Sequence, residues 1–320
     1  MDTRALRYDC HTHVGMSLSF YFDGKYPTCH DMVSLLEKLD RSDVDRAIVF
    51  PLPDHFASSG VQALSAEQNR AICDSLFSIP YAWQNERLIL EAKRLGRGRI
   101  LTFGMFSLCR GVEEQVATLD RHFLNGEMFG LKYYADTDRF DLNQFADVGK
   151  PFIDLALRHN VPIVFHISQC SSLGGVGYSF PEGVMTLAKR YPALRVSIAH
   201  MAHFNEAILK ESQALENVFF DLSPFLHLCH IRKCVAMDPA WRLPYDDPEA
   251  VLKIVASELP NKLMWGTDMP VNYTCDLNCD SHDFQHERYT LEENYRIFRS
   301  LPAASQRALE TNNVERFLYG

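Results

Sequence analysis

Two histidines, His11 and His13, stand one residue apart at the end of the strand-like segment 8–14. Side chains two residues apart along a strand lie on the same face. His11 and His13 therefore present two imidazoles to one point, a spacing that suits two ligands of a single metal ion. A pair of this kind is also compatible with two structural histidines, so the rest of the chain decides between the two interpretations.

Three further polar residues follow apolar segments that are typical of buried strands. His166 comes after the apolar run 162–165, His200 after 195–199, and Asp268 after 263–267. In a parallel sheet the carboxyl ends of the strands lie at one edge. The sequence therefore predicts that these three side chains meet His11 and His13 at a shared site. Convergence of four strand ends is stronger evidence than any single motif.

The elements that position these residues are eight strand-like segments, each followed by a helix-like segment. The strand candidates are 8–14, 46–52, 100–107, 130–135, 162–168, 195–202, 218–222 and 263–267. The helix candidates are 31–39, 66–79, 83–95, 112–123, 151–159, 181–190, 205–215, 248–259 and 290–301. This alternation predicts an α/β fold, a single (β/α)8 TIM barrel spanning residues 1–320. An open doubly wound sheet is the second choice, but no glycine-rich phosphate turn follows the first strand.

Three connections after strands are long: 51–65, 223–247 and 269–289. Long connections inside a compact domain are usually functional. In a barrel they would lie over the face where the strands end, which is where active sites form. We therefore expect them to cover the site.

Composition excludes several classes of function. The chain has 320 residues, with 32 Lys and Arg against 41 Asp and Glu, and a formal net charge of −9. Without a basic cluster, nucleic acid is not an expected partner. No run approaches the roughly 20 apolar residues of a membrane helix, and the first residues do not resemble a signal peptide. Nine cysteines without a secretion signal indicate reduced thiols and a cytoplasmic protein.

The chain resembles the metal-dependent amidohydrolase superfamily, in particular the amidohydrolase-2 branch that contains aminocarboxymuconate-semialdehyde decarboxylase. The resemblance covers nearly the whole chain and rests on segments 9–13, 165–166, 199–200, 265–268 and 312–320, in the family's order.

The resemblance implies that one divalent metal is held by His11, His13, His166 and Asp268. Zinc is the first choice, with manganese, iron and cobalt as alternatives. It also implies a catalytic His200, which orients or polarises a small-molecule substrate. A homodimer is compatible with the resemblance, which leaves the oligomeric state open.

The preferred function is hydrolysis of an amide, lactone or ester bond in a small carboxylated compound. Three imidazoles and a carboxylate suit zinc and leave room for a water, whose pKa the ion brings to about 7. Asp268 would take the proton from that water and pass it to the leaving group, and His200 would stabilise the oxyanion. Non-oxidative decarboxylation of an unsaturated or aromatic acid is the alternative, and a catalytically silent metabolite-binding barrel is the third hypothesis.

Five residues are weaker candidates. Lys132 lies in the fourth predicted strand, where it would either bridge a second metal, as in some members of the superfamily, or contact substrate. Asp221 ends the seventh predicted strand and points to the same mouth, in either a substrate-binding or a structural role. Arg139, Arg232 and Arg242 lie in or near connections, where an arginine can bind a substrate carboxylate.

Two groups of soft ligands lie in the long connections: His227, Cys229, His230 and Cys234 in the segment 227–234, and Cys275 and Cys279 in the segment 275–286. Their spacings do not match a tight zinc knuckle. We interpret them as residues of a lid, with an accessory metal site as the less favoured alternative.

Overall fold

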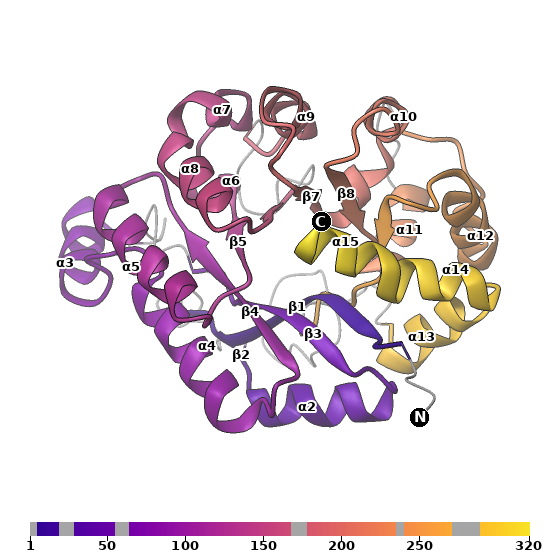
Figure 1. Ribbon diagram of the computed structural model, residues 1–320, viewed down its shortest axis with the longest axis horizontal. Helices are drawn as coiled ribbons and strands as arrows, with labels where there is room; N and C mark the ends of the chain where they lie inside the picture. Colours follow the sequence, from indigo (N-terminus) through magenta and orange to yellow (C-terminus); the bar gives the residue numbers. More distant parts are fainter. Residues whose placement is uncertain (1–4, 19–28, 55–63, 168–177, 235–239, 271–288) are drawn as a thin grey trace.

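The computed structural model describes residues 5–18, 29–54, 64–167, 178–234, 240–270 and 289–320. Within these residues nine strands form one curled sheet in the order β2-β1-β3-β4-β5-β6-β7-β8-β9 (Figure 1). Neighbouring strands are parallel except for the antiparallel pair of β1 and β2. The strands are β1 (Tyr8–Met16), β2 (Cys29–His30), β3 (Arg46–Pro51), β4 (Ile100–Phe106), β5 (Gly130–Tyr133), β6 (Ile163–Phe165), β7 (Val196–Ile198), β8 (Val218–Asp221) and β9 (Leu263–Met264).

Helices form a layer outside the sheet (Figure 1). None of the described helices combines the length and the apolar character needed to cross a lipid bilayer. The helices are α2 (Met32–Arg41), α3 (Ala66–Leu76), α4 (Ala82–Leu95), α5 (Val112–Leu124), α6 (Ala135–Asp138), α7 (Phe145–Val148), α8 (Lys150–Arg158), α9 (Pro181–Arg190), α10 (Glu206–Ser212), α11 (Phe225–Cys234), α12 (Pro248–Glu258), α13 (Leu291–Arg299), α14 (Ala303–Arg307) and α15 (Asn313–Tyr319). Short 3-10 turns at Leu142–Gln144 and Ala199–Phe204 and a π turn at Ala308–Asn312 complete the described elements.

The predicted alternation of strands and helices is confirmed, because each of the eight predicted strands overlaps a parallel strand of the sheet. Local sequence sets several of the helix boundaries. Thr290 and Glu293 form the capping box that starts α13, and Asp31 caps α2 by accepting a hydrogen bond from the Ser34 N–H. Strand β2 was not predicted, since two residues are too few to show an alternating pattern.

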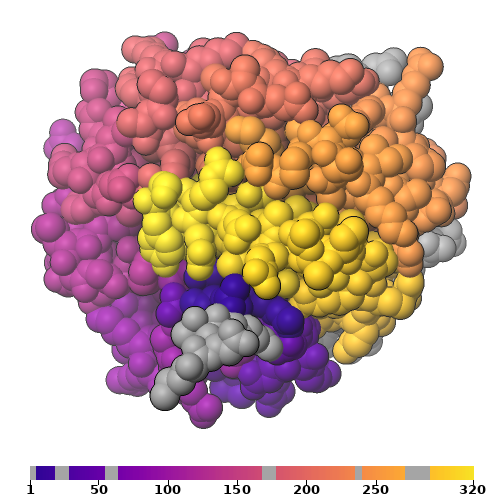
Figure 2. All heavy atoms as spheres, turned by 45° about the vertical axis from the view of Figure 1, so that its right-hand side comes forward, coloured from indigo at the N-terminus to yellow at the C-terminus, as the bar shows by residue number. Residues whose placement is uncertain are grey.

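The inside of the curled sheet is filled by apolar side chains from nearly every strand, and helix α15 packs against one end of this core. Val314, Phe317 and Leu318 of α15 join the cluster that contains Phe103 and Phe219. Figure 2 shows the C-terminal helices beside the N-terminal strand on the molecular surface. The Thr311 hydroxyl donates to the Leu6 carbonyl there, at 2.7 Å. This end of the sheet is blocked, so only the carboxyl ends of the strands are left for a site.

Backbone hydrogen bonds also link β1 to the residues around and after β9. Cys10 N–H donates to the Trp265 carbonyl at 3.0 Å, and Asp268 N–H donates to the His11 carbonyl at 2.7 Å. These bonds hold Asp268 beside His11, although 257 positions separate them in the sequence. Residues of the first strand and residues that follow the last strand therefore lie side by side at the carboxyl ends of the strands.

Two boundary predictions are wrong. The sixth predicted strand was expected to run to Ala202, but β7 ends at Ile198. Five consecutive residues, 200–204, have φ between 45° and 57°, so the chain leaves the strand in a left-handed turn. Each non-glycine residue in that conformation costs about 1–2 kcal/mol, a strain that often marks functional sites. The segment 223–247, expected to be a structureless connection, contains helix α11.

Candidate metal centre

His11, His13 and Asp268 form a group in which one ligand atom from each residue lies within 4.8 Å of the others. His11 and His13 come from β1, and Asp268 follows β9. All three side chains are buried. Asp268 Oδ1 lies 3.4 Å from His11 Nε2 and 3.2 Å from His13 Nε2. The two histidines of the first strand and the aspartate after the last strand therefore lie together, as the sequence predicts.

The far side of each ring faces an acceptor. His13 Nδ1 donates to the Pro51 carbonyl at 3.0 Å, and His11 Nδ1 lies 3.0 Å from Asp221 Oδ2. Because one nitrogen of each neutral imidazole carries the proton, these contacts leave the lone pair on Nε2. Both lone pairs then point toward Asp268.

This donor set fits a divalent transition metal. Zinc binds imidazole nitrogen and carboxylate oxygen at about 2.0–2.2 Å, which places the corners of a tetrahedron about 3.3 Å apart. The distances of 3.4 and 3.2 Å from Asp268 Oδ1 to the two Nε2 atoms agree with that spacing. Nitrogen and oxygen ligands also suit manganese, iron and cobalt.

The electrostatics keep the imidazole and the carboxylate in the forms that bind a cation. Burial, helped by the nearby Lys132 ammonium, lowers the pKa of His11 to about 4, so its ring is neutral at neutral pH. Burial alone would raise the pKa of Asp268, but the surrounding imidazoles of His13, His11 and His200 outweigh it and hold that pKa below its usual value.

His166, the fourth predicted ligand, lies beside this group and pairs with His200. His166 Nδ1 and His200 Nε2 are 3.0 Å apart, and the His166 ring stacks on Tyr134 at 4.3 Å between centroids. His200 Nδ1 donates to the Ser223 carbonyl at 2.6 Å, so His200 Nε2 accepts from His166 Nδ1. The lone pair of His166 is then on Nε2, and its ligand role stays a prediction.

Asp221 contacts a metal-ligand candidate with one oxygen and the His200 segment with the other. Its Oδ2 faces His11, while Oδ1 accepts from the His200 N–H at 3.2 Å and from the Ser223 N–H and hydroxyl at 3.2 and 2.5 Å. Burial opposes ionisation, but His11, His200 and Lys132 together hold the pKa of Asp221 well below its usual range. The predicted substrate-binding role of Asp221 stays a prediction.

Lys132 is fully buried in the same mouth. Its Nζ lies 3.3 Å from His11 Nε2 and over two aromatic rings, 4.8 Å from the Phe50 centroid and 5.0 Å from the Tyr134 centroid. Burial lowers the pKa of Lys132 from 10.5 to about 8, and the charges of Asp221 and Asp268 only partly oppose this. A buried ammonium is therefore held next to the candidate metal ligands.

Three residues around the site were not predicted from the sequence. Tyr134 directs its hydroxyl toward His13 Nε2, at 3.5 Å, and it follows Lys132 by two positions in the fourth predicted strand, so the two-residue period could have identified it. His30 donates from Nδ1 to the His13 carbonyl at 2.7 Å, but it lies on the unpredicted β2. Asp9 accepts from the His11 and Thr267 N–H groups, both at 3.1 Å, and the second of these contacts depends on the register of distant strands.

The predicted arginines are scattered. Arg139 and Arg242 are exposed, whereas Arg232 is buried in α11. The structure does not place any of them at the His11–His13–Asp268 group, and their substrate role stays a prediction.

Of the two groups of soft ligands, His227, His230 and Cys234 lie in α11, where Cys234 Sγ is 3.7 Å from His230 Nε2. The segment 275–286 lies outside the described residues. The lid role assigned to both groups from sequence therefore stays a prediction.

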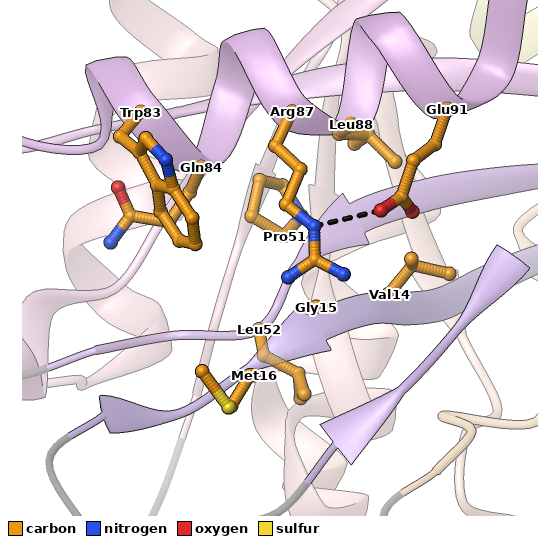
Figure 3. Close-up of a pocket in the computed structure, with 10 residues that line it drawn as sticks. All are labelled: Val14, Gly15, Met16, Pro51, Leu52, Trp83, Gln84, Arg87, Leu88 and Glu91. Atoms are coloured by element: carbon orange, nitrogen blue, oxygen red, sulfur yellow. Dashed lines mark hydrogen bonds and ion pairs between the residues drawn. The ribbon is translucent and has the colours of Figure 1, made fainter.

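A shallow hollow with little enclosed space lies between α4 and the ends of β1 and β3 (Figure 3). Trp83 and Arg87 of α4 line one side of it, and Gly15 and Leu52 line the other. The Arg87 Nε–H donates to Glu91 at 2.7 Å. The hollow contains none of the predicted site residues, so it adds no group to the metal centre.

The chain belongs to the amidohydrolase family, whose model matches residues 8–319. This match confirms the resemblance to the amidohydrolase-2 branch. A comparison with curated proteins finds no match.

Solved structures share the fold at low sequence identity, and these neighbours are TIM barrels. The 2,6-dihydroxybenzoate decarboxylase from Rhizobium is 13% identical over 98% of both chains, with a TM-score of 0.60. The 5-carboxyvanillate decarboxylase from Novosphingobium aromaticivorans, solved with manganese and a nitrobenzoic acid, is 15% identical over 99% of this chain and 97% of that one, with a TM-score of 0.56. A Pseudomonas putida protein provisionally named 2-pyrone-4,6-dicarboxylic acid hydrolase is 13% identical over 98% of both chains, with a TM-score of 0.54.

Proposed function

We propose that this chain is a metal-dependent hydrolase that opens an amide, lactone or ester bond in a small carboxylated compound. The observation that carries the proposal is the convergence of His11 Nε2, His13 Nε2 and Asp268 Oδ1 beside the buried ammonium of Lys132. Zinc is the proposed ion, with His166 as a fourth ligand. Manganese is the alternative, because the 5-carboxyvanillate decarboxylase neighbour holds it.

When bound, the metal lowers the pKa of water to about 7 and so supplies a nucleophile at neutral pH. Asp268 takes the proton of that water on its carboxylate and later returns it to the leaving group. His200 lies in the same mouth and orients the substrate, and it would stabilise the developing oxyanion once its Nε2 carries a proton, because Nδ1 already donates to the Ser223 carbonyl. The Tyr134 hydroxyl is a second donor for that charge, since it lies 3.5 Å from His13 Nε2.

Lys132 defines the charge of the substrate in this proposal. An ammonium with no exposed surface is costly unless it meets an anion. A substrate carboxylate would supply that anion, and the rings of Phe50 and Tyr134 would contact its unsaturated or apolar part. We assign Lys132 to substrate binding in preference to a bridge between two metals.

Non-oxidative decarboxylation is the second candidate. Two of the neighbours named above are decarboxylases of aromatic acids. In the same site Lys132 would orient the substrate, and Asp268 or His200 would protonate the carbon that loses carbon dioxide. Both reactions use the same residues, so the products distinguish them.

We further infer that residues 1–320 form one domain in which the sheet closes as a (β/α)8 barrel. The hydrogen bonds between Cys10 and Trp265 and between Asp268 and His11 support closure. A homodimer and a cytoplasmic location stay predictions from the sequence.

The proposal is tested by incubating the metal-loaded protein with panels of lactones, N-acyl acids and aromatic acids in water enriched in oxygen-18. We expect a hydrolysis product that carries one heavy oxygen in its new carboxyl group. Release of carbon dioxide without oxygen incorporation would establish the decarboxylase instead. Binding of these compounds without any turnover would contradict both and favour the silent barrel.

A further inference from the structure

The contacts of His11 with Lys132 and Asp221 indicate which of its two ring nitrogens carries the proton. Lys132 Nζ can only donate, and it lies 3.3 Å from His11 Nε2, so that nitrogen accepts and carries no proton. The proton is then on Nδ1, which lies 3.0 Å from Asp221 Oδ2. Neither His11 Nδ1 nor Asp221 Oδ2 makes a hydrogen bond of regular geometry in the described part of the chain, and both atoms are buried. The 3.0 Å contact between them is therefore the polar contact that can satisfy each atom.

We propose that Asp221 is a positioning residue, which fixes the proton of His11 on Nδ1 and thereby keeps on Nε2 the lone pair that the metal would bind. The inference rests on the proposed metal site. Carboxylates that accept from the outer nitrogen of a metal-bound histidine set the orientation and tautomer of the ring, and losing one typically costs 10–100-fold in metal affinity.

The same carboxylate also holds the histidine assigned to the substrate. Asp221 Oδ1 accepts from the His200 N–H, and Ser223, which donates to Asp221 twice, receives the His200 Nδ1–H on its carbonyl. The Asp221 side chain thus fixes the positions of two residues, the proposed metal ligand His11 and the proposed substrate-binding residue His200. The left-handed turn that begins at His200 is anchored by this contact.

The substitution Asp221→Asn keeps the size of the side chain and removes only its ability to accept a proton from His11 Nδ1. Two backbone N–H groups and the Ser223 hydroxyl need an acceptor at the Oδ1 position, so the amide oxygen of asparagine will stay there. Its NH2 group must then face His11 Nδ1, and it cannot accept a proton donor. His11 is driven to carry its proton on Nε2, which removes the lone pair that the metal needs.

Asp138→Asn is the matched control. Asp138 is also buried, and its Oδ2 accepts from the Leu108 N–H at 2.7 Å. Its Oδ1 accepts from the Ser107 hydroxyl at 2.8 Å. A hydroxyl can reverse and accept from an amide, so both contacts of asparagine at position 138 are satisfied. The two variants make the same chemical change, but only Asp221→Asn places an amide NH2 group against an imidazole nitrogen.

Two measurements on the purified full chain test the proposal. Nitrogen-15 spectra of histidine side chains in the metal-free protein, with His11 assigned by the loss of its signals in His11→Ala, should show the Nδ1–H tautomer in the wild type and the Nε2–H tautomer in Asp221→Asn. Competition with a chelator should show zinc affinity at least tenfold weaker in Asp221→Asn and within about threefold of wild type in Asp138→Asn.

An Nε2–H tautomer of His11 in the wild type would overturn the proposal, even if Asp221→Asn does not fold. Equal zinc affinity in wild type and folded Asp221→Asn would also overturn it. Failure of the wild type to bind any metal would instead refute the proposed function, while the tautomer measurement would still decide the role of Asp221.

Discussion

Lys132→Met is expected to stabilise the metal-free protein while it removes turnover. Burial lowers the pKa of Lys132 from 10.5 to about 8, which corresponds to a cost of about 3 kcal/mol at neutral pH. Methionine fills a similar volume without a charge. We therefore expect the free energy of unfolding at pH 7 to rise by about 2 kcal/mol, measured by urea denaturation.

If the buried charge of Lys132 is the cause, the gain in the free energy of unfolding of Lys132→Met must depend on pH. The folded-state pKa of Lys132 lies below that of the unfolded chain, so the cost is present in full below pH 8. It fades as the pH rises from about 8 to 10.5, because the folded protein then holds the lysine neutral. The advantage of Lys132→Met should shrink over the same range.

The same substitution at an exposed lysine shows whether the stability gain comes from burial of the charge or from the loss of a lysine as such. Lys253 is exposed and pairs with Glu249 on the same helix, so Lys253→Met should change stability by less than about 0.5 kcal/mol. If Lys132→Met were destabilising at pH 7, or if its effect did not depend on pH, Lys132 would be a structural lysine and its assigned role in substrate binding would be wrong.

Asp268→Asn is expected to cause the largest loss of activity. The carboxylate is a proposed ligand and the proposed base, and its Oδ1 faces the Nε2 atoms of both His11 and His13. Its depressed pKa means that the substitution removes a full negative charge at neutral pH. We expect kcat/KM to fall by about 10³ or more on whichever substrate the wild type turns over, with weaker metal binding.

The control for this variant makes the same substitution at the surface. Asp246 is exposed and pairs with Lys233, so Asp246→Asn should leave kcat/KM and metal content unchanged. Asp268→Asn with a full complement of metal and kcat/KM within tenfold of the wild type would show that another group is the base.

The sequence was enough to predict the features that follow from the order of the strands and helices and from the two-residue repeat of side chains along a strand. Alternating apolar segments predicted the eight parallel strands, and the two-residue period predicted that His11 and His13 face one point. Applied to the fourth predicted strand, the same period would have put Lys132 and Tyr134 on one face. These predictions succeeded because neighbours along one strand have a fixed geometry.

Contacts that depend on register and on backbone strain could not be predicted in this way. The contact between Asp221 and His11 joins strands 210 positions apart in the sequence, so it exists only once the curled sheet has formed. The left-handed run from His200 to Phe204 contains no glycine or asparagine, the residues that adopt positive φ most readily. Tertiary contacts such as the His200 hydrogen bond to Ser223 hold it there.

The most direct test of the metal centre is elemental analysis of the purified chain, with wild type and His11→Ala prepared in parallel. We expect about one equivalent of zinc or manganese per wild-type chain and its loss in His11→Ala. Two equivalents would make Lys132 a bridge between two ions. A wild-type chain that holds no metal and takes up none on dialysis would refute the proposed metal centre.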